Sequence, residues 1–400
     1  MAARWRRSGR AAAKVQALLA EAIGHHQAGR LAQAEPIYRQ ILALEPDHFD
    51  ASHFLGVMAS QRGDHAAALR QIDLALSKNP DSVFALNNRG VALYELERFD
   101  EALASYDRAL ALAPDYAEAL SNRGNALKEQ RRFDEALASY DRALALRPDY
   151  AEALSNRGVA LYELKRYDEA LASCDRALAL KPEHAEALSN RGNSLKALKR
   201  FDEALASYDR ALALRPDFAE ALTNRGNNLK ELRRFDEAQA CYDRALALRP
   251  DYAEAHLNAA LFRLLLGDFD RGWKHYEWRW QASELRNEKR KFSEPQWTGS
   301  DEIAGKTILL HAEQGFGDTI QFCRYVPLVA ARGARVILEA PAALQTLLGT
   351  LPGAAQVVAM GQPLPNFAST ALCSACRWRS GRRSKRSPRR RRICPRRRTR

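Results

Sequence analysis

The sequence predicts an all-α superhelical solenoid of helical hairpins, followed by a partial α/β segment and a disordered basic tail. The solenoid is predicted by seven prolines that recur every 34 residues: Pro46, Pro80, Pro114, Pro148, Pro182, Pro216 and Pro250. A fixed period of this length indicates one supersecondary unit stacked repeatedly on its neighbours. Stacked units form an extended concave surface rather than a closed pocket, so the pattern favours binding over catalysis.

Each repeat is predicted to be a hairpin of two helices. In residues 117–150 the apolar and small side chains fall at helical spacing in two blocks, one with Leu120 and Gly124 and the other with Tyr140. Residues 129–133 between the blocks are polar and only long enough for a tight turn. The pattern therefore indicates helix, turn and helix in every unit.

Acidic residues and prolines mark the predicted helix ends. Asp115 lies three residues before Glu118, a variant of the capping box that predicts Asp115 as the cap of the first helix. Asp134 suits the positive end of the second helix dipole. Pro148 ends that helix because it has no amide hydrogen to donate.

Small residues recur where two helices must approach closely, and an aromatic residue fills the space beside them. The first helix has one glycine per unit: Gly90, Gly124, Gly158, Gly192 and Gly226. The second helix has one alanine: Ala102, Ala136, Ala170, Ala204 and Ala238. The large residue is Tyr106, Tyr140, Tyr208 or Tyr242, with Cys174 in one unit. Glycine within a helix costs about 1 kcal/mol relative to alanine, so its recurrence indicates a packing requirement.

This combination of leucine, glycine, alanine, aromatic residue and proline resembles the tetratricopeptide repeat family. The resemblance covers residues 15–286, as roughly eight units of which the last is degenerate, after a disordered N-terminus at residues 1–14. It implies that the first helix of each unit lines a concave groove that binds a protein or peptide ligand.

Asparagine occupies one position of the first helix in six consecutive units. These ladder asparagines are Asn88, Asn122, Asn156, Asn190, Asn224 and Asn258. Each amide offers a donor and an acceptor, the pair needed to bind an extended peptide backbone. The ladder resembles that of the O-linked N-acetylglucosamine transferases, which implies peptide binding by these residues. The alternative is that the amides, and the arginines that follow them, bond to neighbouring repeats and only stiffen the stack.

Aromatic residues are concentrated after the repeats. Trp273, Tyr276, Trp278, Trp280 and Trp297 place four of the six tryptophans of the chain within a short stretch. Such a cluster covers the apolar face of a last hairpin. A carbohydrate platform is the alternative. We expect residues 287–300 to be a junction to the next segment.

Residues 301–366 are predicted to be a partial α/β segment. An apolar run at 306–313 has the length of a strand, a glycine-containing loop and a helical stretch to Ala331 follow, and a second strand is predicted at 335–339. Strand, helix and strand form one βαβ unit with parallel strands. The loop then lies at the carboxyl end of the first strand, where such sheets bind ligands.

The segment resembles the amino-terminal half of the heptosyltransferase-like glycosyltransferases, through its Gly317-Asp318 pair. The resemblance implies that Asp318 is a general base on an acceptor hydroxyl, and that Gly315, Gly317, Asp318 and Thr319 form a nucleotide or sugar loop. The alternative is that Asp318 only caps the following helix. Because the segment supplies only part of one lobe, we expect a truncated transferase without activity as the alternative to a binding scaffold.

The basic charge is confined to the tail. The net charge is +13, while residues 371–400 contain 13 Arg and one Lys and no acidic residue, so the remainder has a charge of −1. We therefore expect no nucleic-acid partner for the folded part. Residues 367–400 are rich in arginine and proline without helical periodicity, which indicates translation of a shifted reading frame. A disordered tail and a nucleic-acid-binding arm are the alternatives.

The six cysteines show no disulfide framework and no paired metal spacing, so we expect neither a metal nor a cofactor. No apolar run approaches the length of a membrane span. Lys14 and Glu21 interrupt the apolar core that a secretion signal needs. A cytoplasmic location is the expectation that follows.

Overall fold

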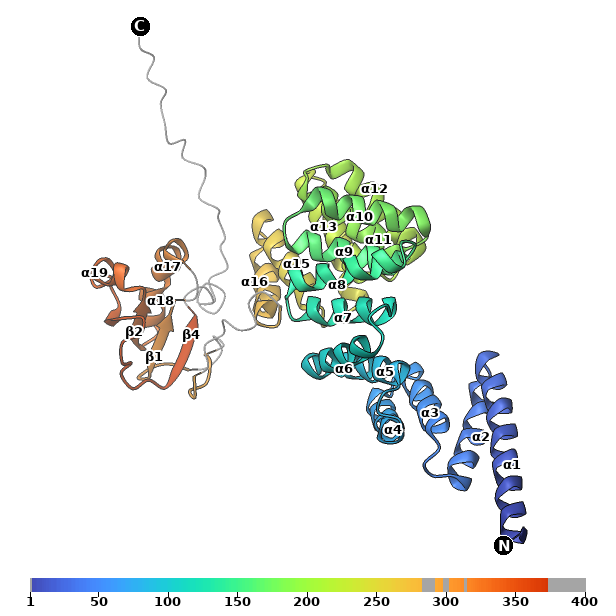
Figure 1. The fold of residues 1–400 in the computed structure, drawn as a ribbon. Helices are drawn as coiled ribbons and strands as arrows, with labels where there is room; N and C mark the ends of the chain where they lie inside the picture. The colour runs from blue at the N-terminus through green and yellow to red at the C-terminus, as the bar shows by residue number, and fades with distance from the viewer. Residues whose placement is uncertain (1, 283–291, 298–301, 313–314, 373–400) are drawn as a thin grey trace. The chain divides into compact units, whose positions relative to one another are not determined.

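The computed structural model describes residues 2–282, 292–297, 302–312 and 315–372. Helical hairpins follow one another through the first part of the chain, and a parallel sheet of four strands lies in the last part (Figure 1). The predicted fold class, a helical solenoid followed by a small α/β segment, is confirmed. By compactness the chain divides into two units, and the division falls after Cys241, within a helix.

Unit 1, residues Met1–Cys241, is built from hairpins of a first and a second helix. The first helices are α1 (Ala2–Gln27), α3 (Phe49–Gln61), α5 (Val83–Glu95), α7 (Ala117–Glu129), α9 (Ala151–Glu163), α11 (Ala185–Ala197) and α13 (Ala219–Glu231). The second helices are α2 (Leu31–Leu44), α4 (His65–Lys78), α6 (Phe99–Leu112), α8 (Phe133–Leu146), α10 (Tyr167–Leu180), α12 (Phe201–Leu214) and α14 (Phe235–Leu248), the last of which continues into unit 2.

Two predictions about helix starts are wrong. Disorder was expected over residues 1–14, yet α1 begins at Ala2, because the alanine-rich start has high helix propensity. Asp115 does not cap α7, whose N-cap is the next residue, Tyr116, without a side-chain hydrogen bond. The helix therefore starts one residue later than predicted. In other units the residue equivalent to Tyr116 caps the first helix through its side chain: His48, Ser82 and His184.

The glycine and tyrosine positions pack as predicted. A Cβ atom added at Gly124 would lie 2.6 Å from Cε1 of Tyr140, which is fully buried. The Tyr140 hydroxyl donates to Oδ1 of Asn125 at 2.7 Å, which holds the ring in place. Gly158 faces the smaller Cys174, whose burial raises the pKa of the thiol to about 12. Only glycine therefore fits beside the buried tyrosine.

First helices of consecutive hairpins contact one another, from α3 with α5 through to α11 with α13, more extensively than the second helices do. In a curved stack the elements on the inner side lie closest together. The first helices of unit 1 therefore form its inner side, and their surface is called the inner row here. Burial is greatest between the two helices of a hairpin and between adjacent hairpins, where alanine and leucine predominate.

Unit 2, residues Tyr242–Arg400, opens with the end of α14 and the last hairpin, α15 (Ala253–Leu266) and α16 (Phe269–Tyr276), which a short 3-10 helix, η1 (Glu277–Trp280), extends. Trp278 stacks on His256 of α15, as expected of an aromatic cluster that covers the last hairpin. Trp297 instead belongs to the core of the sheet, where it is 1% exposed.

The predicted junction at residues 287–300 lies largely outside the described residues, which omit 283–291 and 298–301. Nothing therefore tests its boundaries, which stay a prediction.

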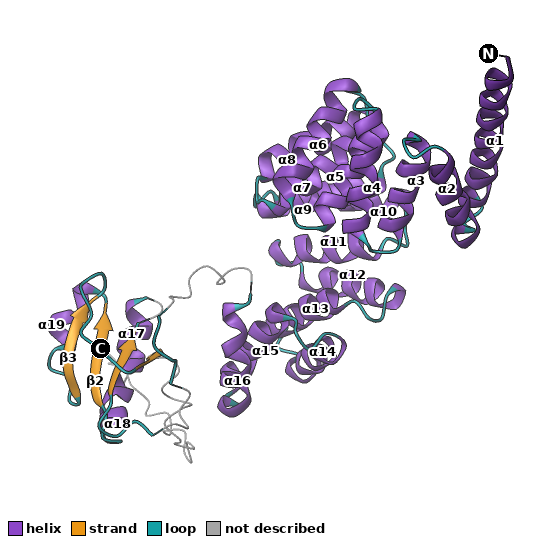
Figure 2. Ribbon diagram, turned by 90° about the horizontal axis from the view of Figure 1, so that it is seen from below, coloured by secondary structure: helices purple, strands orange, loops and turns teal. Residues whose placement is uncertain are grey.

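The sheet has four parallel strands in the order β3-β2-β1-β4. They are β1 (Thr307–His311), β2 (Arg335–Ala340), β3 (Ala354–Ala359) and β4 (Ser369–Leu372). The helical segments between them are α17 (Phe316–Phe322), η2 (Cys323–Tyr325), α18 (Val326–Ala330), η3 (Ala342–Leu344) and α19 (Gln345–Leu348). Figure 2 shows short helices beside the strands. The predicted βαβ unit is confirmed: β1 and β2 pair in parallel, and α17 and α18 lie between them in the sequence.

Strand β4 corrects the predicted start of the tail at residue 367. Residues 369–372 pair with β1, and Ala371 is fully buried, because this short apolar stretch completes the sheet edge. Residues 373–400, with the arginine-rich sequence, lie outside the described residues. Among the helices that the structure describes, none combines the length and apolar composition needed to cross a bilayer.

Candidate functional site

The ladder asparagines lie on the first helices, half-buried, and most of them bond across the boundary between repeats. Nδ2 of Asn122 donates to Oδ1 of Asn87 at 3.0 Å. Asn190 donates in the same way to Oγ of Ser155 at 3.2 Å. In both cases the acceptor belongs to the preceding first helix, so each bond ties one repeat to the next.

The pattern continues in two further ladder residues, with different acceptors. Nδ2 of Asn156 donates to Oδ1 of Asn125 at 3.0 Å. Asn88 is paired with Nε2 of His53, 3.0 Å away. Four of the six ladder asparagines thus use their amide donor within the solenoid.

The last two ladder asparagines differ. Asn258, in unit 2, donates to the carbonyl oxygen of Glu254 in its own helix at 2.8 Å. Among the described residues, Asn224 forms no hydrogen bond through its side chain. The regular spacing in the sequence therefore gives identical positions but not identical hydrogen bonds.

The acceptor side of the ladder is open. No described residue donates a hydrogen bond to a ladder Oδ1 atom, although five of the six Nδ2 groups are engaged. An amide whose donor is fixed has a fixed orientation, so its carbonyl is fixed too. The inner row of unit 1 therefore presents hydrogen-bond acceptors whose direction is set by the solenoid.

Three supporting residues were not identified from the sequence: Asn87, Asn125 and Ser155. Asn125 accepts hydrogen bonds from both Asn156 and Tyr140, so it joins the inner row to the buried tyrosine. The signal was present, because asparagine recurs three positions after the ladder at Asn193, whose Oδ1 accepts from Tyr208 at 2.7 Å.

The arginines that follow the ladder asparagines are structural, as one of the two interpretations had it. Nε of Arg123 donates to Oδ1 of Asp107 in the preceding hairpin at 2.6 Å, and Nη1 donates to Oγ of Ser139 at 2.7 Å. We call this arrangement the arginine clamp. It recurs in Arg89 with Asp73 and Ser105, and in Arg191 with Asp175 and Ser207.

The loop after β1 in unit 2 is the second candidate site. Asp318 is half-buried in the first turn of α17, and it does not cap that helix, whose N-cap is Gly315. The simple capping interpretation of Asp318 is therefore wrong. A Cβ atom at Gly315 or Gly317 would meet nothing within 4 Å, so packing against described atoms does not require glycine at either position. Thr319 is buried, and its hydroxyl donates to the Gly315 carbonyl at 3.1 Å.

Two buried polar residues mark the carboxyl edge of the sheet. His311 ends β1 and is paired in register with Glu339 near the end of β2. They are 8% and 1% exposed, respectively. Glu339 was not predicted from the sequence, because a lone carboxylate in an apolar strand has no distinguishing spacing. Ligands of parallel sheets bind at this edge.

Comparison with known families identifies the repeats. Tetratricopeptide repeat models match residues 19–83 and 121–185, residues 81–149, and residues 185–218 and 219–252. Together these matches cover more than half of the chain without interruption.

A curated relative matches a shorter stretch. The chain is 42% identical over 77 residues to the photosystem I assembly protein Ycf3 of Acaryochloris marina (strain MBIC 11017). The alignment takes in 18% of this chain and 46% of the relative, so the chain spans less than half of that protein's length.

Two solved structures share the fold. A tetratricopeptide repeat protein from Parabacteroides merdae has a TM-score of 0.51 at 19% identity, with 60% of this chain and 96% of that chain covered. The APC/C hetero-tetramer Cut9–Hcn1 has a TM-score of 0.53 at 17% identity, with 68% and 54% covered. At these identities the similarity shows the architecture alone.

Proposed function

Because the chain belongs to the tetratricopeptide repeat proteins, we propose that it binds a protein or peptide partner along the inner row of unit 1, through the ladder asparagines. The observation that supports this proposal is the open acceptor of each ladder amide. Except in Asn224, the amide donors of the unit 1 ladder are engaged inside the solenoid, so the carbonyl oxygens are what remains for a partner. A partner then has to supply N–H groups, which every peptide backbone has.

The spacing of the ladder fits an extended peptide. Packed helices lie about 8–10 Å apart, and an extended chain advances about 3.3 Å per residue. Consecutive ladder carbonyls then meet roughly every third residue of the peptide. Binding through the backbone at this spacing leaves the choice of side chains to the neighbouring positions of the inner row.

The fixed amides also lower the cost of binding. A free asparagine loses rotamer freedom when a ligand immobilises it, at about 0.5–1.5 kcal/mol per side chain. Asn122 and Asn190 are already held by bonds to Asn87 and Ser155, so much of that cost is met on folding. The bonds that stiffen the stack thus also prepare the surface, and the two interpretations of the ladder are compatible.

The test separates binding from stiffness. A peptide of about twelve residues, which spans roughly four ladder positions, is selected from a random display library on the full chain. Its affinity is then measured with four asparagines changed to alanine: Asn122, Asn156, Asn190 and Asn224. We expect the alanine variant to lose binding by at least about tenfold.

A matched control keeps the acceptor. Aspartate at the same four positions retains a side-chain oxygen but loses the donor to the neighbouring repeat. We expect it to melt earlier, as the alanine variant does, yet to retain more of the peptide affinity. If the alanine variant binds the peptide as the wild type does while it melts earlier, the ladder is structural and the proposal fails.

A second candidate function is favoured by the buried His311 and Glu339 at the carboxyl edge of the sheet, next to the loop with Asp318. This second candidate is a glycosyltransferase that uses a sugar nucleotide and whose repeats select a protein or glycan acceptor. Asp318 would be the general base on the acceptor hydroxyl. The binding proposal expects no hydrolysis or transfer when the full chain is incubated with sugar nucleotides. Turnover that disappears in Asp318→Asn would favour the second candidate.

A further inference from the structure

The arginine clamp is missing between the first two hairpins. The three clamp positions at this interface are occupied by Leu55, Arg39 and Gln71, where the next interface has Arg89, Asp73 and Ser105. The long arginine side chain that occupies this position in the later hairpins of unit 1 is replaced by a shorter leucine. The carboxylate that receives the arginine is replaced by a positive charge. This interface therefore has space and a charge pattern that the other interfaces of unit 1 lack.

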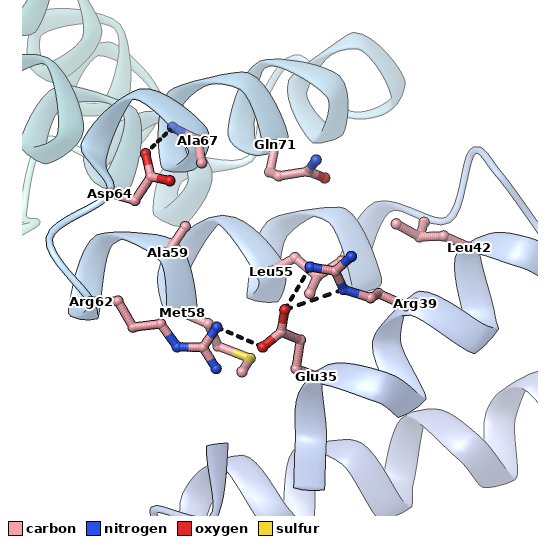
Figure 3. Close-up of a pocket in the computed structure, with 10 residues that line it drawn as sticks. All are labelled: Glu35, Arg39, Leu42, Leu55, Met58, Ala59, Arg62, Asp64, Ala67 and Gln71. Carbon is pink, nitrogen blue, oxygen red and sulfur yellow. Dashed lines mark hydrogen bonds and ion pairs between the residues drawn. The ribbon is translucent and has the colours of Figure 1, made fainter. Parts of the chain in front are cut away.

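A pocket of about 350 Å³ lies at this place, between α2, α3 and α4. Figure 3 shows the lining side chains. Leu42, Leu55, Met58 and Ala59 form an apolar part, with Met58 only 1% exposed. The volume is at the lower end of the range of about 300–1,000 Å³ that ligand sites occupy. An apolar side chain with a few adjoining polar atoms fits such a space.

Two guanidinium groups are held beside the pocket by one recessed carboxylate. Oε1 of Glu35 accepts from Nη2 of Arg39 at 2.7 Å, and Oε2 lies 2.5 Å from Nη1 of Arg62 (Figure 3). Hydrogen bonds from Arg39 and then from Arg62 lower the pKa of Glu35, so it stays ionised. The side chain of Glu35 is 21% exposed, against 71% for Arg39 and 46% for Arg62. The arginines thus face solvent with N–H groups that Glu35 does not use.

Gln71 supplies the complementary polar atom. Its Oε1 is buried and has no hydrogen-bond partner among the described residues. A buried acceptor without a donor is destabilising, because it has lost its hydrogen bonds to water without replacement. The corresponding serine, Ser105, has the guanidinium of Arg89 as its donor. A ligand that enters this pocket and donates an N–H to Gln71 removes that cost.

We propose that this pocket binds an acidic peptide segment that inserts one apolar side chain. The side chain occupies the space next to Leu55 and Met58, a backbone N–H donates to Gln71, and flanking carboxylates meet the outer N–H groups of Arg39 and Arg62. The proposal does not rest on the ladder. Phe54, at the ladder position of α3, stacks on Tyr38 with ring centroids 5.5 Å apart, outside the pocket lining.

The test uses the methyl group of Met58 as a local reporter. The chain has three methionines, so methyl-¹³C methionine labelling gives a simple NMR spectrum in which Met360, 44% exposed, is an internal control. The full chain is titrated with acetyl-Glu-Glu-Leu-Glu-amide to millimolar concentration. We expect a saturable shift of the Met58 signal and no shift of the Met360 signal. A Met58 signal that does not move would overturn the proposal.

Two matched peptides test the chemistry. Replacement of the leucine by serine removes the apolar group, and replacement of the glutamates by lysine reverses the charge. Both are expected to bind at least about tenfold more weakly. Equal shifts with all three peptides would contradict the assigned ligand class.

A rebuilt clamp provides the variant control. The substitutions Leu55→Arg, Arg39→Asp and Gln71→Ser restore at this interface the residues that the next interface uses. We expect this variant to fold, to melt no earlier than the wild type, and to lose the Met58 response to the acidic peptide. A rebuilt variant that melts like the wild type and still shows the full response would place the peptide elsewhere and sink the idea.

Discussion

His256 and His275 face each other through their Nδ1 atoms, which lie 2.6 Å apart in the last hairpin. Nε2 of His256 lies 2.8 Å from the carbonyl oxygen of Pro250. Because a carbonyl can only accept, this Nε2 carries a hydrogen, and Nδ1 of the neutral ring is then the acceptor for His275. The His256 ring also stacks on Trp278, with centroids 4.2 Å apart. The pair therefore requires both rings to be neutral or to share a single proton.

The last hairpin is expected to lose stability in acid because of this pair. Burial, then the charge of Arg263, lowers the pKa of His275 from 6.5 to about 4, and burial also lowers the pKa of His256. Arg271 acts in the same direction, and Asp243 opposes it. Between pH 6.5 and pH 4 the unfolded chain binds more protons than the folded chain, so stability is complete above 6.5 and falls as the pH drops toward 4. Thermal melting across this range measures the loss.

The matched variant for the histidine pair is His275→Gln, because a glutamine amide still donates to Nδ1 of His256 but does not titrate. We expect the melting temperature of this variant to depend less on pH between 6.5 and 4. Identical pH profiles for wild type and variant would show that the pair does not govern the acid sensitivity.

The same substitution, glycine to alanine, is expected to have opposite effects at two helical positions. Gly124→Ala should destabilise by about 1–3 kcal/mol, because its Cβ would overlap the fixed ring of Tyr140. Gly24→Ala should stabilise by up to about 1 kcal/mol, because this exposed position in α1 has nothing within 4 Å. Urea unfolding of both variants checks the prediction. Equal effects at the two sites would mean that helix propensity alone decides.

Sequence periodicity predicted the hairpins well because each repeat repeats the same packing requirement. Gly124 and Tyr140 were recognisable as packing partners from the sequence alone. The cap at Tyr116 was missed, because an aromatic N-cap without a side-chain bond has no compositional signal. Strand β4 was missed because four residues next to an arginine-rich stretch carry too little periodicity to be recognised, and only its pairing with β1 defines it.

The candidate site was less predictable than the fold. The ladder positions followed from the sequence, but which amide atom is free depends on the residues opposite, such as Asn87 and Ser155. The pocket beside Leu55 depends on what is absent from one repeat. A departure from a repeated pattern is informative only once the structure shows which side chains occupy the corresponding space in the other repeats.

The turns between first and second helices contain removable strain. The second residue before α8, Arg131, has positive φ, as have its equivalents in the other hairpins. Glycine occupies this position in the first two hairpins and in the last, at Gly29, Gly63 and Gly267. The five middle hairpins instead have Glu97, Arg131, Lys165, Lys199 and Arg233, with φ between 57° and 61°. A left-handed conformation costs a residue with a side chain roughly 1–2 kcal/mol. Replacement of such a residue by glycine removes this cost. Part of the resulting gain in stability is offset by the greater conformational freedom of glycine in the unfolded chain.

Lys165→Gly is therefore expected to raise the free energy of unfolding by about 0.5–1 kcal/mol. The reverse exchange, Gly63→Lys, should lower it by a similar amount. A Cβ atom at Gly63 would meet nothing within 4 Å, so only the backbone conformation opposes the lysine. Denaturant unfolding of the two variants measures both signs, and a neutral Gly63→Lys would remove the argument from strain.

The arginine clamp allows a comparison between two neighbouring repeats. Arg123 bonds to both Asp107 and Ser139, whereas Arg157 keeps only the ion pair with Asp141 at 2.6 Å among the described residues. The hydroxyl that Arg157 lacks belongs to Ser173, which donates to the carbonyl oxygen of Leu154 at 3.0 Å.

Lysine cannot reproduce the two directed bonds of the guanidinium, although it retains the charge. We therefore expect Arg123→Lys to destabilise by about 1 kcal/mol, the typical contribution of a hydrogen bond. Arg157→Lys should cost less, because a half-exposed ion pair contributes only about 0.2–1 kcal/mol and lysine retains part of it. Thermal melting of the two single variants, with Arg123→Lys also combined with Ser139→Ala, measures the difference. If the bond from Arg123 to the Ser139 hydroxyl causes the larger destabilisation, Arg123→Lys should cost no more than Arg157→Lys once Ser139 is alanine. An unchanged difference in that background would contradict this explanation.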